Sequence, residues 1–190
     1  MKRMTEKKKR RKLTLLGEVV DTLITFGITF IVMYVVVTYL FTPVRVLGNS
    51  MFPELHDGDF GFANTVGRNV FGVDHGDVVI VYLEDRNTYL IKRIIGLPGD
   101  TVRMEDHTLY VNDIAVEEDY LDEAYIAECG EDEFFADIEE IRLGDNEYYV
   151  LGDNRVNSRD SRVYGPFSKD QIRAKDVFVI WPLSHAGLKK

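Results

Sequence analysis

The chain has 190 residues, of which 45% are hydrophobic and 29% are charged, and its formal net charge is −9. This length allows one ordinary domain with an additional segment, and the composition excludes a disordered or collagen-like chain. The single cysteine, Cys129, excludes an intramolecular disulfide framework and a cysteine-rich zinc module.

Charge is distributed unevenly along the chain. Residues 1–12 carry eight Lys or Arg residues and one Glu, whereas residues 42–190 carry 15 basic and 29 acidic residues. The acidic body argues against nucleic acid as a partner, because binding to a phosphate backbone starts from a basic face. We expect residues 1–14 to form a separate basic tail.

An uncharged stretch follows this tail. Residues 22–41 are twenty consecutive uncharged residues, rich in Ile, Val, Leu and Phe, and a helix of that length spans about 30 Å, the hydrocarbon core of a bilayer. A cleavable signal peptide has a shorter apolar region that ends at a small-residue site, whereas this stretch ends in Leu40 and Phe41. A buried core helix is disfavoured because the stretch is apolar on all sides. We predict a retained transmembrane helix over residues 15–41.

The orientation of this helix follows from its flanking charges. Eight basic residues precede the apolar stretch, whereas the first twenty positions after it contain only Arg45. The positive-inside rule then places the N-terminus in the cytoplasm and residues 42–190 outside it. The expected location is the cytoplasmic membrane, crossed once, with the lipid bilayer as a partner.

Residues 42–182 are expected to form a mostly β domain, followed by a C-terminal tail over 183–190. Five runs are rich in β-branched and aromatic residues, at 77–83, 88–95, 108–111, 147–151 and 175–181. Gly-Asp pairs typical of turns separate them, at Gly58, Gly76, Gly99, Gly144 and Gly152. Short strands joined by turns favour an antiparallel, barrel-like or coiled sheet, with a hairpin over 101–111.

One segment interrupts this pattern. Residues 117–147 contain 14 acidic residues and a single basic one, Arg142. Like charge at this density is unfavourable in a buried sheet, so we interpret the segment as an acidic surface excursion or small subdomain. A solvated face with no function explains most such runs.

Ser50 is a candidate nucleophile, nine residues after the apolar stretch. Gly48 allows close backbone approach and Pro53 stiffens the following turn. Neighbouring backbone amides could then stabilise an oxyanion. Most isolated serines are structural, so the assignment depends on finding a base.

The better candidate base is a lysine. The four histidines lie in Asp- or Gly-rich turns or the tail, where solvated histidines are common, and none belongs to a known catalytic or metal motif. In a strand over 89–95, alternation places Lys92 on the same face as Leu90 and Ile94. Desolvation there would lower the lysine pKa from about 10.4 by up to about 3–5 units. The alternative is that Lys92 reaches water from a strand edge.

A polar block at residues 152–165 provides the third element. It contains few side chains able to fill a core and many that hydrogen bond. Ser158 could orient a neutral lysine amine, and Asp160 and Arg162 could brace the loop as a charge pair. Taken alone, the block would be read as a polar surface loop.

Together, these features resemble the type I signal peptidases over residues 15–182. The motifs that carry the resemblance are, in chain order, Ser50-Met51-x-Pro53, Lys92-Arg93 before Gly96-Leu97-Pro98-Gly99-Asp100, and Gly152-Asp153-Asn154-Arg155 with Ser158, Asp160, Ser161 and Arg162. Gly48 stands where some members have a serine that donates to the oxyanion, as in forms typical of Gram-positive bacteria. The oxyanion would then depend on backbone amides, including that of Ser50. Glu54 stands where the motif usually has Thr.

The resemblance implies a membrane-bound serine endopeptidase that removes signal peptides from exported preproteins, cutting after small residues. It implies Ser50 as nucleophile, Lys92 as general base and Ser158 as the group that orients the lysine, without a metal or other cofactor. Asp160 and Arg162 would support the site. The implied substrate-binding residues are Val46, Met51, Leu90 and Ile91, and an association with the export machinery is possible.

Three other interpretations compete with this one. A membrane-anchored assembly module that lost catalysis would lack Ser50 or Lys92, and both are present. A self-cleaving Ser/Lys regulator would be soluble and carry a DNA-binding helical domain, and neither feature is indicated. A peptidase dedicated to a narrow set of substrates stays open.

Overall fold

The computed structural model describes residues 2–67 and 72–189, and among these the side chains of residues 2–16 and 37–40 are not described. The chain divides into two compact units, Met1–Leu40 and Phe41–Lys190.

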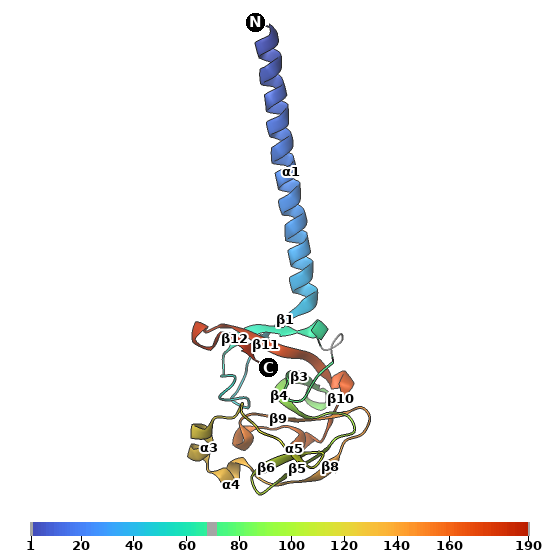
Figure 1. Cartoon of the computed structure of the whole chain (residues 1–190), viewed down its shortest axis with the longest axis vertical. Coiled ribbons are helices and arrows are strands. Elements are labelled where there is room, and N and C mark those ends of the chain that lie inside the picture. The colour runs from blue at the N-terminus through green and yellow to red at the C-terminus, as the bar shows by residue number, and fades with distance from the viewer. Residues whose placement is uncertain (1, 68–71, 190) are drawn as a thin grey trace. The chain divides into compact units, whose positions relative to one another are not determined.

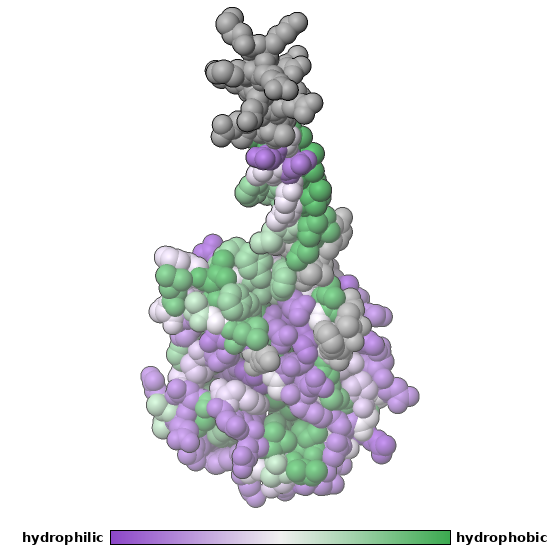
Figure 2. All heavy atoms as spheres, turned by 45° about the horizontal axis from the view of Figure 1, so that its top comes forward, coloured by the Kyte–Doolittle hydropathy of each residue, from purple (hydrophilic) through white to green (hydrophobic). Residues whose placement is uncertain are grey.

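The first unit is one long helix, α1 (Lys2–Leu40). Its segment Gly17–Val36 has a mean hydropathy of 2.1, and none of this segment is buried against protein. Figure 2 shows hydrophobic side chains along the described part of the helix. The helix is long and apolar enough to cross a membrane. It also continues through the basic segment that we expected to be a separate tail over residues 1–14.

The second unit contains an eight-stranded antiparallel sheet in the order β1-β2-β11-β3-β4-β9-β10, with β12 paired to β11. Its strands are β1 (Phe41–Arg45), β2 (Phe60–Asn64), β3 (Val78–Leu83), β4 (Thr88–Gly96), β9 (Glu147–Leu151), β10 (Phe167–Ser168), β11 (Ile172–Trp181) and β12 (Gly187–Lys189). Within the unit, β1, β11 and β12 lie at one end (Figure 1).

A smaller antiparallel sheet lies at the other end of this unit, in the order β7-β6-β5-β8 (Figure 1). Its strands are β5 (Thr101–Glu105), β6 (Thr108–Val111), β7 (Ile114–Ala115) and β8 (Ile138–Arg142). The short helices of the unit are α3 (Glu123–Cys129), α4 (Glu131–Phe134), α5 (Ser161–Tyr164), η1 (Glu84–Arg86), η2 (Arg155–Asn157), η3 (Lys169–Gln171) and η4 (Leu183–His185). The predicted mostly antiparallel β fold is confirmed.

The predicted turns are partly confirmed. Asp106 and His107 connect β5 and β6 with φ of 49° and 60°, which makes the expected hairpin over 101–111. Gly58, Gly76 and Gly99 have φ of 91°, 86° and 86°, the left-handed region that favours glycine. The glycines of the other two Gly-Asp pairs do not have positive φ.

The acidic segment is less detached than the sequence suggested. Its strand β8 pairs with β5 in the smaller sheet, and Phe134 is buried with 1% exposure. Most of its carboxylates are exposed, as expected for an edge strand and two short surface helices. The segment is therefore a surface layer attached to the fold through a few apolar contacts.

Hydrophobic packing anchors the two segments that carry the candidate site. Met51 and Leu55, in the loop between β1 and β2, are buried with Val78, Val177 and Val179. On β4, Ile94 is fully buried and Leu90 packs against the same cluster. The loop that bears Ser50 and the strand that bears Lys92 are both fixed to the core.

Candidate active site

Ser50 lies in a loop of residues 46–59 that connects β1 to β2. The ends of this loop are closed by hydrogen bonds from Val46 N–H to the Asp59 carbonyl (2.8 Å) and from Gly58 N–H to the Val46 carbonyl (3.0 Å). Ser50 itself is half-buried, and the next residue, Met51, is 1% exposed. The loop presents the serine hydroxyl while its apolar side chains face the core.

Lys92 lies next to this hydroxyl. Its Nζ atom is 2.7 Å from Ser50 Oγ and donates a hydrogen bond to the Ile91 carbonyl, also at 2.7 Å. The lysine is 1% exposed, because β4 is an interior strand between β3 and β9. The alternative that Lys92 reaches water is wrong. Among the described residues, Ser50 Oγ has this lysine and no histidine as its hydrogen-bond partner.

Burial changes the acidity of the lysine. Desolvation lowers the pKa of Lys92 from 10.5 to about 8, and the charge of Arg162 lowers it further, against the opposing effect of Asp160 and Asp153. An amine with a pKa of about 8 is neutral in about one molecule in ten at pH 7. It can therefore accept a proton from a hydroxyl at hydrogen-bonding distance.

The polar block after β9 holds the serine loop in place. The backbone N–H of Asn154 donates to the Ser50 carbonyl at 3.1 Å, and its side-chain amide donates to the Asn49 carbonyl at 3.0 Å. A Cβ atom on Gly152 would lie 2.4 Å from the Ser50 carbonyl oxygen and 2.2 Å from Ser158 Oγ. Only glycine permits this approach of the two segments.

Asp160 and Arg162 form the expected charge pair. The guanidinium donates to both carboxylate oxygens, at 2.9 and 2.8 Å, and the Gly152 N–H donates at 3.0 Å to a carboxylate that is fully buried. Burial raises the pKa of Asp160, but the hydrogen bonds and charge of Arg162 and the Gly152 amide outweigh it and hold the pKa below its usual range. The pair places one negative and one positive charge near Lys92, and these shift the lysine pKa in opposite directions.

Ser158 is placed differently from the expectation. Its hydroxyl is buried against Gly152, beside the Ser50 carbonyl. Within residues 2–67 and 72–189, no hydrogen bond joins it to Lys92, whose partners are Ser50 Oγ and the Ile91 carbonyl. The structure thus brings Ser158 to the site without the direct contact that an orienting role would need in this state.

Sequence reasoning missed two buried ion pairs around the site. Arg93 donates to both oxygens of Asp153, at 2.9 and 2.7 Å, and to the Gly76 carbonyl at 2.7 Å. Arg155 forms a second pair with Glu118, with side chains only 1% and 8% exposed. All four charged residues were visible in the sequence, but nothing in it specified which would pair. Glu118 also shows that part of the acidic segment reaches inward.

A cleft of about 580 Å³ opens at the Ser50–Lys92 pair. It is lined by residues of β1, the serine loop and the first half of β4, and these include all four predicted substrate-binding residues: Val46, Met51, Leu90 and Ile91. In the described pairing, β9 contacts β4 only from Arg93 onward, and β1 is an end strand. Two strand edges therefore border the cleft.

The site combines a serine hydroxyl, a buried lysine amine hydrogen-bonded to it and an open cleft on an antiparallel β scaffold. These are the groups needed for acyl transfer by a serine hydrolase. Comparison with known proteins shows which family of serine hydrolases the chain belongs to. Residues 19–181 match the family "Signal peptidase, peptidase S26". The chain belongs to this family, and it is a serine endopeptidase that removes signal peptides.

Individual relatives agree with this assignment. Signal peptidase I of Bacillus licheniformis is 38% identical over 183 residues, which are 95% of this chain and 97% of the relative. Signal peptidase I S of Bacillus subtilis (strain 168) is 40% identical over 77% of this chain and 80% of the relative. The crystal structure of a signal peptidase I from Enterococcus faecalis V583 is 29% identical and covers 54% of this chain and 95% of its own, with a TM-score of 0.50. The resemblance read from the motifs is confirmed.

Proposed function

We propose that the protein cleaves signal peptides with Ser50 as the nucleophile and Lys92 as the general base. The observation that carries the proposal is the 2.7 Å separation of Lys92 Nζ and Ser50 Oγ, with a lysine that is 1% exposed. A lysine in water is an ammonium ion and cannot act as a base near neutral pH. Burial beside the hydroxyl supplies both the proximity and the lowered pKa that the reaction needs.

The reaction would proceed in two steps. Neutral Lys92 takes the Ser50 proton as Oγ attacks the carbonyl carbon of the scissile bond, and the resulting ammonium protonates the leaving amine. This leaves an ester between Ser50 and the signal peptide. Lys92 then takes a proton from water, the hydroxide attacks the ester, and Ser50 Oγ is reprotonated as the signal peptide leaves.

Backbone amides would stabilise the oxyanion formed in each step. Gly48 offers no side-chain donor, and its own N–H donates to Asp57 Oδ1 at 2.8 Å. We therefore assign the role to the N–H of Ser50 rather than to that of Gly48. The bonds from Asn154 to the Asn49 and Ser50 carbonyls support this assignment because they fix the peptide planes on either side.

The substrate would bind as an extended strand in the cleft. The edges of β1 and the first half of β4 offer backbone groups for pairing with a peptide. Val46, Met51, Leu90 and Ile91 would surround the small side chains that precede the cut. Asp160 and Arg162 would support the lysine electrostatically, and Ser158 would orient it once substrate displaces the present hydrogen bonds.

The membrane arrangement is part of the proposal. α1 would cross the cytoplasmic membrane once, with residues 1–14 in the cytoplasm and the domain over 42–182 outside. Residues 183–189 belong to this domain rather than to a separate tail, because β12 pairs with β11. The charge asymmetry around the apolar stretch supports this orientation. Anchoring enzyme and preprotein to one bilayer raises their effective concentration, and it would bring the protein near the export machinery.

The test uses the full chain in detergent micelles and a preprotein substrate. We expect Ser50→Ala to abolish cleavage and Lys92→Ala to reduce it by at least about 10²–10⁴-fold, the usual contribution of a general base. Lys169→Ala, at an exposed position in η3, is the matched control and should cleave normally. Wild-type rates in either dyad variant would contradict the assignment. Binding of preprotein without cleavage by the wild-type protein would instead favour an assembly module.

A further inference from the structure

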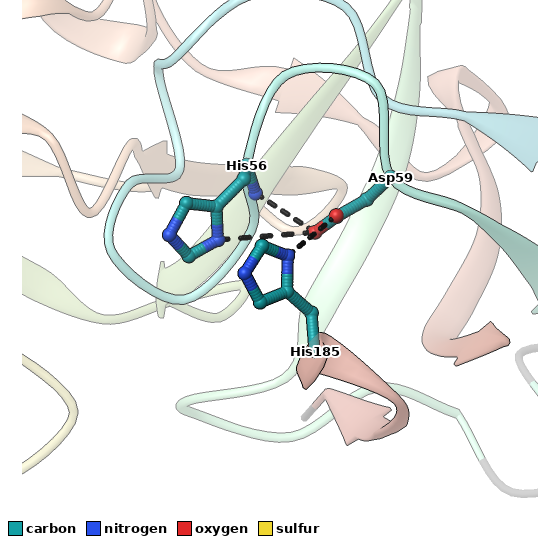
Figure 3. A group of neighbouring side chains, drawn as sticks. All are labelled: His56, Asp59 and His185. Atoms are coloured by element: carbon teal, nitrogen blue, oxygen red, sulfur yellow. Dashed lines mark hydrogen bonds and ion pairs between the residues drawn. The ribbon is translucent and has the colours of Figure 1, made fainter. Parts of the chain in front are cut away.

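A second polar cluster lies outside the active site. Figure 3 shows His56, Asp59 and His185 with the imidazole groups directed at one carboxylate. His185 Nδ1 is 2.9 Å from Asp59 Oδ1, and His56 Nδ1 is 4.0 Å from Asp59 Oδ2. The carboxylate is 1% exposed, and the two imidazoles are 35% and 30% exposed. The expectation that all four histidines are merely solvated is wrong for these two.

The fold brings these residues together from opposite ends of the domain sequence. His56 and Asp59 belong to the end of the serine loop, where the Asp59 carboxylate accepts the His56 backbone N–H at 2.9 Å. His185 belongs to η4, 126 residues further along the chain than Asp59. The two imidazole rings stack with a centroid separation of 4.0 Å and an interplanar angle of 17°. Stacking leaves both Nδ1 atoms facing the same side.

One polar atom of the cluster is unsatisfied. His56 Nδ1 is buried and makes no hydrogen bond within the described parts of the chain. The nearest carboxylate oxygen is already occupied by the backbone N–H of the same histidine. A buried nitrogen without a partner is unfavourable by roughly 1–3 kcal/mol in general. In the tautomer with the proton on Nε2, Nδ1 carries a lone pair that could bind a cation.

We propose that His56, Asp59 and His185 bind a divalent transition-metal ion of the Zn²⁺ class. Two imidazole nitrogens and one carboxylate oxygen are ligands that Zn²⁺ accepts, at distances of about 2.0–2.2 Å. Ligand atoms around a tetrahedral zinc ion are then about 3.3 Å apart. The three candidate atoms lie within 4.8 Å of one another, so small side-chain rotations bring them to this spacing. Ca²⁺ and Mg²⁺ are disfavoured because they select oxygen ligands.

The ion would have a structural effect. The loop that provides two ligands also carries Ser50, and its end is closed against Val46. The C-terminal segment already contacts this loop through Lys189 Nζ and Glu54 Oε1, which are 3.4 Å apart. Metal binding would add a stronger connection between the C-terminal segment and the serine loop. The inference does not depend on the catalytic roles proposed for Ser50 and Lys92.

The test is a Zn²⁺ titration of the full chain in detergent micelles after treatment with a chelator. We expect saturable binding of one equivalent by calorimetry, together with an increase in the melting temperature on addition of Zn²⁺. His56→Asn and His185→Asn place an amide nitrogen near the position of Nδ1, so they keep a hydrogen-bond donor but lose a metal ligand. Each should weaken binding at least about 10–100-fold, the loss seen when even an outer partner of a metal site is removed.

The matched control is His75→Asn. His75 Nε2 pairs with Asp100 Oδ2 at 2.7 Å, a similar His–Asp contact at the surface, and we expect its replacement to leave Zn²⁺ affinity unchanged. Absence of one-equivalent binding to the wild-type protein would overturn the proposal, whatever the folding of the variants. Equal binding by both cluster variants and the wild type would also overturn it, because the ion would then be held elsewhere.

Discussion

Cleavage by this protein should accelerate as the pH rises and level off above about pH 8. The reason is the pKa of Lys92, which burial lowers from 10.5 to about 8. The neutral fraction of such an amine is about 1% at pH 6, about 10% at pH 7 and about 90% at pH 9. If Lys92 is the base, kcat/KM should therefore increase about tenfold per pH unit below pH 7.5.

The size of the pKa decrease follows from the burial of the Lys92 amine and from the charged groups around it. A decrease from 10.5 to about 8 corresponds to about 3 kcal/mol of preference for the neutral form. Arg162 contributes to this decrease, whereas Asp160 and Asp153 oppose it. Arg162→Gln removes the contributing cation and leaves the Asp160 charge uncompensated, so it should raise the lysine pKa and move the profile to higher pH.

The assay is kcat/KM for one preprotein in detergent micelles between pH 6 and pH 10. Lys92→Arg is the informative control, because a guanidinium is not deprotonated in this range and the variant should be inactive throughout. A flat profile, or a midpoint near 10.5, would refute the reasoning. So would an Arg162→Gln profile that moves to lower pH.

Three further predictions concern stability and positioning. Lys92→Met should abolish cleavage but raise the free energy of unfolding at pH 7 by about 1–3 kcal/mol, because it removes a buried ammonium. In urea titrations this gain should vanish between about pH 8 and pH 10.5. In that range the folded wild type has already lost the Lys92 proton, whereas the unfolded chain still binds it. The wild type is therefore stabilised as the pH rises. Gly152→Ala would place a methyl group 2.4 Å from the Ser50 carbonyl oxygen, and thermal unfolding should show a loss of about 1–3 kcal/mol; an unchanged melting temperature would contradict the close approach. Asn154→Ala removes the hydrogen bond to the Asn49 carbonyl, so kcat should fall about fivefold with an unchanged circular dichroism spectrum, as expected for about 1 kcal/mol of lost positioning. Full activity would show that this bond does not position the serine.

Much of the strand layout could be predicted because local patterns determine it. The runs at 108–111 and 147–151 coincide with β6 and β9, since β-branched and aromatic residues there are bounded by turn residues. β11 starts three residues before the predicted run, at Ile172. The strand β2 was not predicted, because its five residues include Gly61 and Asn64 and lack a clear alternation.

The site was predictable only in part. The strand alternation placed Lys92 on one face with Leu90 and Ile94, which is local information, but it left open whether the amine is buried, as it is in the structure. By contrast, Glu118 and Arg155 are 37 residues apart and meet only in the folded domain. The expected contact between Ser158 and Lys92 is absent from the described hydrogen bonds, because side-chain direction in a loop is not encoded in spacing. Composition and periodicity do not determine which distant residues form ion pairs, or how loops orient their side chains.

If Lys92 is the base, its dependence on burial makes the enzyme inert outside its native state. A chain that is still unfolded has an ordinary solvated lysine, protonated at neutral pH, and an unactivated serine 42 residues away in the sequence. Proteolysis would begin only when strand β4 is enclosed by its neighbours. Folding would thus switch on the protease, in the way that removal of a pro-segment activates a zymogen. A newly made, unfolded copy could not cleave neighbouring polypeptides.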